Sequence, residues 1–372
     1  MNILYFFQEK ETPMYQWQRL HIIDELSHHN CHFTFINPLA YSSPEEANEA
    51  LINHVRDHNY DLFFSNICYH KAIFKDTIER IKERGIPTLC FRSDNLTIPF
   101  IDKEVGPSFD LLWLTSKETK YLYDRWGINT MFAPYAANPF FFKYTEPHSF
   151  CRNVCFIGTP YGSRPLMINA LTEQGIPVDV YYKKNKSLLN NEVKSSIKSN
   201  PVLPNSRMIL FNRLLFQEGR SVILGSLKNK FAGSVKLLEN ENMHGYFSVP
   251  SDEQPIIYSN HVLAISSTST KSTDVLKNPL KVINLRAFEI PMSGGIQICK
   301  YNPELAEYFE EDKEIVFYRD NEELVDKARY YSLEASESAI RKMKEAARRR
   351  AEKEHSWWNR FSLAFDKLGI KH

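Results

Sequence analysis

The sequence predicts an α/β protein with two domains of ordinary size. Its 372 residues are more than one hydrophobic core usually organises. In the N-terminal half, short apolar segments alternate with helical patterns, which is the rhythm of a parallel sheet covered by helices on both faces. An apolar strand that leads through a glycine loop into a helix follows near residue 153, where we expect the second domain to open.

The first predicted domain covers residues 1–143. Its strands are short β-branched or aromatic runs: Ile3 to Phe7, Phe33 to Ile36, Leu62 to Ser65, Thr88 to Phe91, Leu111 to Thr115 and Met131 to Ala133. Ligands of such sheets meet the loops at the carboxyl ends of the strands. One of these loops carries Asp94, whose carboxylate could orient an acceptor hydroxyl or take its proton, or could equally form an Asx turn or helix cap.

The second predicted domain covers residues 150–354. It opens with an apolar strand that ends in Gly158, and a helix begins near Arg164. A strand, a glycine loop and a helix in this order can cradle a phosphate group. Arg164 could pair with that phosphate through two parallel hydrogen bonds, although a solvent-exposed arginine in a first helical turn is as good an interpretation.

Residues 284–318 form the most informative segment. The pattern predicts a helix start with Arg286 and Glu289, a glycine turn, a strand at 296–299, a helix at 303–309 and a strand at 314–318. Gly294 and Gly295 lack a Cβ, so the backbone can take a positive φ and a ligand could approach its N–H groups. A turn that only changes the direction of the chain is the alternative.

This segment resembles the C-terminal signature of CgeB-like, spore-maturation-type group-1 glycosyltransferases. That signature consists of Asn-x-Arg-x-Phe-Glu, a Gly-Gly turn, Glu-Leu-x-x-x-Phe and a Glu-Ile-Val strand, and the matching residues here are Asn284, Arg286, Phe288, Glu289, Gly294, Gly295, Glu304 to Phe309 and Glu314 to Val316. The resemblance implies a GT-B fold, with two Rossmann-like domains facing across a cleft. It also implies a nucleotide-sugar donor held mainly by the C-terminal half, and transfer without an obligatory metal or other cofactor.

The resemblance assigns roles to individual residues. Arg286, the Gly294 and Gly295 amides and Arg164 would stabilise the diphosphate of the donor. Glu289 would hold a donor-sugar hydroxyl or stabilise positive charge at the anomeric centre, and Asp94 is the second catalytic candidate.

Four further residues are donor-binding candidates on the same ground. Tyr161 follows Gly158 as in the relatives, and His244 with Gly245 would lie near the donor base or phosphate. Gln297 stands where the wider retaining group has a ribose-binding glutamate, and a neutral carboxamide there changes how ribose would be recognised.

Kinship also predicts the reaction. We expect a retaining, metal-independent transfer to a glycan, a lipid-linked glycan or a protein, in bacterial surface glycan synthesis. Two alternatives stay open: a GT-B-fold nucleotide-sugar epimerase or hydrolase, and a non-catalytic sugar-nucleotide-binding protein.

Composition limits the partners and the location. Forty-six basic residues against 45 acidic ones leave a net charge of +1, so no global field recruits nucleic acid. The chain has no 18-residue apolar run and starts directly with a strand pattern, so we expect neither a membrane span nor a signal peptide, and a cytoplasmic protein. Residues 183–236 are locally basic. A peripheral contact with an anionic membrane or a polyanionic acceptor is possible there, and a solvated helix face is the preferred interpretation.

The remaining predictions concern the cysteines and the end of the chain. The six cysteines are predicted to be reduced, and no pattern of pairs at ligand spacing indicates a metal site. Residues 355–372 are predicted to form a helix that docks on the first domain. Its apolar face consists of Trp358, Phe361, Phe365 and Leu368, with Trp357 at the edge of that face. The sequence does not indicate an oligomeric state.

Overall fold

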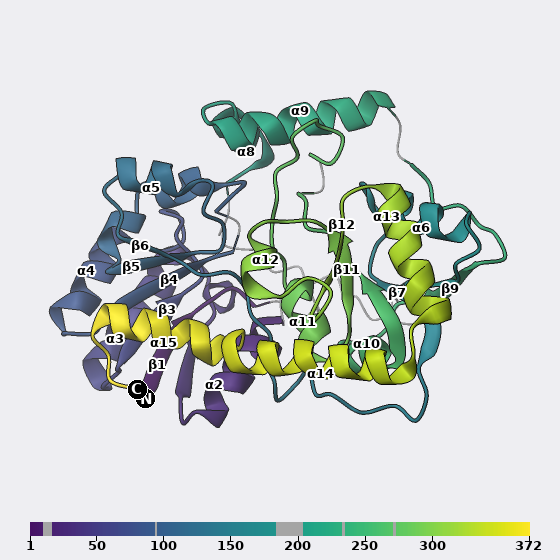
Figure 1. Ribbon diagram of the computed structural model, residues 1–372. Coiled ribbons are helices and arrows are strands. Elements are labelled where there is room, and N and C mark those ends of the chain that lie inside the picture. The colour runs from purple at the N-terminus through teal and green to yellow at the C-terminus, as the bar shows by residue number, and fades with distance from the viewer. Residues whose placement is uncertain (10–16, 94, 184–203, 233–234, 271–272) are drawn as a thin grey trace. The chain divides into compact units, whose positions relative to one another are not determined.

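The computed structural model describes residues 1–9, 17–93, 95–183, 204–232, 235–270 and 273–372, and it forms two compact units (Figure 1). The first unit consists of Met1–Pro134, Ser195–Ile223 and Trp357–His372. The second consists of Tyr135–Lys194 and Leu224–Ser356. The chain therefore passes between the units several times, whereas the sequence suggested one crossing near residue 143 and a second at residue 355.

The first unit contains a parallel sheet of six strands in the order β2-β1-β3-β4-β5-β6. Every predicted strand is present, and no strand end is shifted by more than one residue. The strands are β1 (Asn2–Phe6), β2 (His32–Ile36), β3 (Leu62–Ser65), β4 (Thr88–Arg92), β5 (Leu111–Leu114) and β6 (Thr130–Phe132). The helices are η1 (Arg19–Ile23), α2 (Asp24–His28), η2 (Pro38–Ala40), α3 (Pro44–Asp57), α4 (Lys75–Glu83), η3 (Pro99–Asp102), η4 (Gly106–Ser108), α5 (Lys120–Arg125), α8 (Ser206–Arg213) and α15 (Trp357–Leu368).

Helices cover both faces of this sheet, as the strand pattern predicts. On one face, Leu4 and Phe63 pack with Leu51 of α3 and Ile78 of α4 in one buried cluster. On the other face, Tyr5, Phe64, Phe91 and Trp113 are buried. Helix α15 supplies the rings that meet Phe64, Phe91 and Trp113. The alternation follows from the two-residue period of a strand.

The last helix, α15, packs within the first unit. Phe361 meets Phe64 and Trp113 at ring-centroid distances of 5.2 and 5.3 Å. Trp357 is fully buried, 5.9 Å from Trp113, so the prediction that it lies at the edge of the apolar face is wrong. The outer position belongs to Trp358, which stacks on His29 at 4.1 Å.

The second unit contains another parallel sheet of six strands, in the order β12-β11-β10-β7-β8-β9. The strands are β7 (Cys151–Ile157), β8 (Val178–Lys183), β9 (Met243–Phe247), β10 (His261–Ile265), β11 (Gln297–Lys300) and β12 (Val316–Tyr318). The helices are α6 (Arg164–Thr172), α10 (Gln254–Asn260), α11 (Arg286–Met292), α12 (Leu305–Tyr308), α13 (Asn321–Arg329), η5 (Tyr330–Glu334) and α14 (Glu337–Glu354). Helix α9 (Gln217–Ala232) begins in the first unit and ends in the second.

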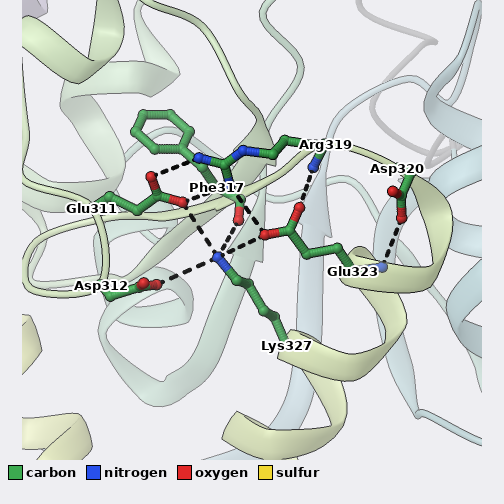
Figure 2. A network of polar contacts seen from close by, with 7 residues as sticks. All are labelled: Glu311, Asp312, Phe317, Arg319, Asp320, Glu323 and Lys327. Atoms are coloured by element: carbon green, nitrogen blue, oxygen red, sulfur yellow. Dashed lines mark hydrogen bonds and ion pairs between the residues drawn. The ribbon is translucent and has the colours of Figure 1, made fainter.

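A network of charges holds the start of α13 against the carboxyl end of β12 (Figure 2). The Lys327 ammonium donates to the Phe317 carbonyl at 2.7 Å and lies 3.1 Å from Glu323 and 3.3 Å from Glu311. Arg319 binds both oxygens of Glu311 at 2.9 Å. Each cation thus meets carboxylates of more than one element, which fixes this corner of the unit more firmly than an isolated surface pair would.

Helix α14 places a fully buried lysine at the end of α10. The ammonium of Lys344 donates to the carbonyls of Ser259 and His261, at 2.7 Å each. Carbonyls at a helix C-terminus lack intrahelical partners and carry partial negative charge, so a cation is favourable there. Burial nevertheless lowers the pKa of Lys344 to about 7.

Candidate functional site

The strand order of the second unit fixes where a ligand would bind. From β7 the chain builds outward through β8 and β9, and then returns to the other side of β7 for β10, β11 and β12. Loops that leave β7 and β10 therefore diverge at the carboxyl edge of the sheet, and such a switch point is where open α/β sheets bind ligands. Gly158 follows β7 there, and the loop after β10 leads to Arg286 at the start of α11.

Gly158 and Arg286 are in direct contact at this switch point. Gly158 has φ +123°, and a Cβ on it would lie 2.6 Å from Nη2 of Arg286. A larger residue would therefore displace the guanidinium, and the positive φ disfavours any side chain at this position. Two residues that lie 128 positions apart in the sequence, as counted from their numbers, thus form one surface.

A second guanidinium lies close to the first. Arg164 donates through Nη1 to the carbonyl of Thr159 at 3.0 Å, and its guanidinium stacks on the ring of Tyr161 at 4.1 Å. Burial lowers the pKa of Arg164, Tyr161 opposes this effect, and the nearby charge of Arg286 lowers the pKa further. Among the residues that the structure describes, no carboxylate forms an ion pair with either arginine. Two adjacent cations without a paired carboxylate form a site for an anion.

Glu289 lies on α11 one turn after Arg286. Its side chain is buried, with 9% exposed. Glu289 and Arg286 both act on the phenol of Tyr258: burial raises the pKa of Tyr258 far above its ordinary value, Arg286 lowers it and Glu289 raises it. The three residues are therefore neighbours, and the carboxylate that the sequence singled out does lie beside the arginine cluster.

The same region holds buried polar atoms with no partner within the described part of the chain. They are the hydroxyl of Ser266 and the side-chain oxygen of Asn284. Ser266 directly follows β10, and Asn284 is fixed by a 2.7 Å bond from its nitrogen to the Ser267 carbonyl. Because an unsatisfied buried polar group costs about 1–3 kcal/mol, these atoms favour a hydrogen-bonding ligand at this edge.

The glycine pair occupies a different place. Gly294, with φ +74°, donates to the Pro291 carbonyl at 2.9 Å, and Gly295 donates to the Ile290 carbonyl at 2.8 Å. These two bonds form a Schellman motif that ends α11. Since α11 starts at the carboxyl edge of the sheet, its end lies toward the amino edge, where β11 begins. The two amides are thus occupied inside the helix end, and the structure does not bring them to the arginine cluster.

Gln297 is the first residue of β11 and is 1% exposed. Both polar atoms of its carboxamide are buried without a hydrogen-bond partner among the described residues. Gln297 lies at the amino end of β11, whereas open α/β sheets bind ligands at the carboxyl ends of their strands. Its contact with a ribose stays a prediction, and this position does not favour it.

His244 and Gly245 also lie away from the arginines, on β9 at the edge of the sheet. His244 Nδ1 lies 2.8 Å from Asp179, and Asn153 donates to the same carboxylate oxygen at 3.0 Å. Gly245 leaves room for Lys183, whose Cε would lie 2.8 Å from a Cβ. The structure thus gives His244 an ion-pair partner on the neighbouring strand, two strands from the switch point.

Asp179 binds a second histidine through its other oxygen. His261 Nε2 lies 2.9 Å from that oxygen, and the thiol of Cys151 lies 3.9 Å from it. Ligand atoms of Cys151, Asp179 and His261 fall within 4.8 Å of one another, a grouping in the described chain that could hold a metal ion. In the structure, the atoms that would bind a metal ion, His261 Nε2, Cys151 Sγ and Oδ2 of Asp179, form hydrogen bonds with one another instead.

The hydrogen bonds of His261 define its charge. Nδ1 lies 2.8 Å from the Ile257 carbonyl and Nε2 faces the Asp179 carboxylate, and both partners can only accept. Both ring nitrogens therefore donate, which makes the ring an imidazolium. Burial lowers the pKa of His261, but Asp179 and Cys151 outweigh burial and raise it to about 9.

This shift predicts a pH dependence. The folded pKa of about 9 exceeds the ordinary 6.5, so the stabilisation by His261 is complete below pH 6.5 and is lost as the pH rises toward 9. The free energy of unfolding of the wild type minus that of His261→Gln should fall by roughly 3 kcal/mol between pH 6 and pH 9.5. Urea unfolding with EDTA present, followed by circular dichroism, measures the difference.

The contribution of Lys344 to the pH dependence of stability has the opposite sign, because its pKa is lowered. Lys344 is present in both proteins, so its contribution cancels in the difference. The other groups around the ring are Asp179, Cys151, His244 and Tyr181. Cys151 does not cancel, because its hydrogen bond with His261 lowers the pKa of the thiol and the substitution removes that effect. Its contribution grows as the pH rises, so about 3 kcal/mol is the upper value of the expected fall. All five tryptophans lie in the first unit, so an unchanged fluorescence transition confirms that the substitution acts on the second unit. An equal difference at both pH values would contradict the assignment.

Among the sequence candidates, the structure brings Gly158, Tyr161, Arg164, Arg286 and Glu289 together. Asp94 lies outside the described residues. The sequence indicated residues 266–274 only as a Ser/Thr-rich loop that frames the cleft, and it gave no role to Tyr258, Ser266 or Asp274 individually. In the structure, Asp274 accepts from the amide and hydroxyl of Ser163 at 3.1 and 2.7 Å and so fixes the loop before Arg164.

Residues 212–365 match the model of a family described as glycosyl transferase-like. The match covers Arg286 and Glu289 and includes most of the second unit. No curated protein sequence matches the chain.

Solved structures of glycosyltransferases share the fold along the whole chain. An α-glucosyltransferase in complex with UDP-glucose and DNA has a TM-score of 0.60 at 11% identity, with 99% of each chain covered. A sucrose-phosphate synthase from Thermosynechococcus elongatus has a TM-score of 0.54 at 12% identity, also with 99% of each chain covered. Anabaena HepE in complex with UDP has a TM-score of 0.55 at 11% identity, covering 99% of this chain and 100% of that one. The fold is therefore that of the GT-B structures, as predicted, and together with the family match it supports a glycosyltransferase.

Proposed function

We propose that this protein is a glycosyltransferase that moves a sugar from a nucleotide-sugar donor to a glycan, a lipid-linked glycan or a protein. The observation that carries the proposal is the pair of adjacent guanidiniums, Arg164 and Arg286, at the switch point of the second sheet. The glycosyl transferase-like match over residues 212–365 supports the reaction class.

The donor diphosphate is placed against the two arginines and Gly158. Arg286 can offer a bidentate face to one phosphate, and the missing Cβ of Gly158 lets the chain approach the ligand closely. As the bond between the sugar and the diphosphate breaks, negative charge accumulates on the leaving group. Positive groups already in place then stabilise the transition state more than the ground state.

The carboxylate of Glu289 lies one helical turn from Arg286 and can accept hydrogen bonds from donor hydroxyls. Its negative charge can also stabilise positive charge that develops at the anomeric carbon. The unpartnered hydroxyl of Ser266 and the side-chain oxygen of Asn284 are additional partners for hydroxyl or base groups of the donor. Binding would satisfy atoms that are costly to leave unpaired.

The finer parts of the proposal rest on the resemblance described above. They are retention of anomeric configuration, transfer without a metal ion and a role in bacterial surface glycan synthesis. Nuclear magnetic resonance of the product reports its configuration, and activity in EDTA reports the metal requirement.

The direct test is ligand binding and turnover. We expect at least one compound from a panel of nucleotides and nucleotide-sugars based on UDP, GDP, ADP, CMP and dTDP to raise the melting temperature, because a ligand at about 100 times its dissociation constant stabilises the folded state by about 2.7 kcal/mol. UDP-glucose is the first donor to try, since similar structures were solved with it.

The outcomes separate the possible classes. Nucleotide release that depends on an added acceptor supports a transferase. Isomerisation or hydrolysis of the donor without an acceptor would indicate an epimerase or hydrolase, and binding without turnover would indicate a non-catalytic protein. If no compound in the panel changed the melting temperature, the donor site itself would be wrong.

A further inference from the structure

Helices α8 and α9 expose an unusual number of large apolar side chains. In the short segment from residue 208 to 215, the exposed fractions are 40% for Met208, 54% for Leu210, 64% for Phe211, 51% for Leu214 and 66% for Leu215. Water-exposed apolar side chains are ordinary when they are scattered, whereas a contiguous group of this kind marks an interaction surface. The solvated polar face that the sequence favoured here is therefore not what the structure shows.

The exposed side chains follow helical spacing. Met208, Phe211 and Leu215 lie three and four residues apart on one side of the segment. The opposite side faces the first unit: Ile209 packs against its core, and Arg213 donates to the Thr97 carbonyl at 3.0 Å. The segment is thus anchored to the fold by one side, and its apolar residues remain on the other.

Helix α9 repeats the arrangement. Its exposed apolar residues are Leu224 at 58%, Leu227 at 50% and Phe231 at 86%, again at spacings of three and four. The two helices follow each other closely in the chain (Figure 1), and Arg220 Nη1 donates to the Leu214 carbonyl at 3.2 Å across their turn.

The charges of the two helices have one sign at the surface. The exposed cations are Arg207, Arg220, Lys228 and Lys230. Residues 205–217 contain no acidic residue, and the one acid of α9, Glu218, is buried and accepts from the Tyr121 hydroxyl at 3.0 Å. An apolar face bordered by cations, with its single carboxylate withdrawn, is complementary to a surface that is both apolar and anionic.

We propose that α8 and the residues that follow it up to Leu215, all in the first unit, bind the surface of an anionic lipid bilayer. The leucine and phenylalanine side chains enter the boundary between headgroups and acyl chains, and the flanking cations pair with lipid phosphates. Tyr121, 41% exposed next to Glu218, suits the headgroup level. In the described residues, no helix has both the length and the hydrophobicity to cross a membrane. This proposal goes beyond donor binding and does not depend on it.

The test uses the full chain and vesicles without any donor. In co-sedimentation, the wild-type protein should have at least tenfold higher affinity for vesicles of phosphatidylcholine and phosphatidylglycerol than for vesicles of phosphatidylcholine alone. The presence of 0.5 M NaCl should weaken the binding to the anionic vesicles. The double variant Leu210→Ser with Phe211→Ser should lose at least tenfold of the affinity. Arg207→Glu should lose about fivefold or more, since it removes one cation at the surface.

Leu333→Ser is the matched control, because Leu333 is 72% exposed and lies on η5, far along the chain from α8 and α9. It should bind vesicles like the wild type, and all variants should keep the wild-type melting temperature. The proposal would be overturned by equal sedimentation of the wild type and the double variant. It would also be overturned if the wild type failed to bind vesicles and formed a dimer, seen by light scattering, that the double variant abolished.

Discussion

Replacing Arg286 with alanine is expected to remove the response to nucleotide and to reduce transfer by about 10²–10³-fold, the usual effect of deleting one preorganised group that stabilises transition-state charge. The guanidinium lies against Gly158 and near Arg164, and within the described residues no carboxylate forms an ion pair with it. Lysine at this position should restore part of the activity, because it keeps the charge but loses the planar fork.

Two measurements check this result. Thermal shift with the nucleotide that stabilises the wild type reports binding, and donor turnover reports chemistry. Arg329→Ala is the control in the same unit, because Arg329 forms only a 3.4 Å surface pair with Asp326. The assignment fails if Arg286→Ala keeps both the nucleotide shift and the turnover of the wild type.

Gly158→Ala tests the same contact from the other side. The new Cβ would lie 2.6 Å from Nη2 of Arg286, so the guanidinium must move. A misplacement of about 1 Å in a group that positions substrate can cost about 10²-fold in rate. Gly175→Ala is a suitable control: Gly175 also has a positive φ, of 76°, but a Cβ there meets nothing within 4 Å. Gly158 has the larger φ, of 123°, so the backbone strain of its substitution is not fully matched by Gly175→Ala. An unchanged melting temperature of Gly158→Ala together with a loss of activity would assign the loss to the contact with Arg286.

Replacing Asp102 with alanine is expected to destabilise the first unit by about 3–5 kcal/mol, because it leaves an uncompensated buried charge. Arg92 Nε lies 2.7 Å from Oδ1 of Asp102, and the two side chains are 6% and 0% exposed. Tyr123 donates to the other carboxylate oxygen at 2.6 Å, and Arg92 also donates to the Asn66 carbonyl at 2.8 Å. Burial raises the pKa of Asp102, and Arg92 opposes this shift.

Urea unfolding followed by tryptophan fluorescence measures the effect in the first unit, where all five tryptophans lie. Asp124→Ala is the control, since Asp124 pairs with Lys120 at the surface and such pairs are worth about 0–1 kcal/mol. The double variant Arg92→Met with Asp102→Leu should lose less stability than Asp102→Ala, because neither charge is then left unpaired in the core. A loss below about 1 kcal/mol for Asp102→Ala would contradict the buried pair.

The sequence predicted the strands of the first unit to within one residue at each end, because each strand is a short apolar run between polar or glycine-containing segments. The positions of Arg286 and Glu289 on one helix also followed from the sequence, since residues three apart share a helix face. Gly294 and Gly295 lie only eight and nine positions after Arg286, but the helix between them carries the chain toward the other edge of the sheet. Their contact with a donor therefore stays a prediction, because the sequence does not show that their amides end the helix.

The sequence by itself therefore determined the fold class, the order of elements and the cationic and acidic residues of α11, because these depend on local pattern and spacing. Only the tertiary structure decided that Arg286 lies on Gly158 beside Arg164, that His244 pairs with Asp179 instead, and that the apolar residues of α8 and α9 remain outside the core. These facts depend on strand order and on which side chains the core accepts, and a linear pattern carries no information about contacts between segments that lie far apart in the chain.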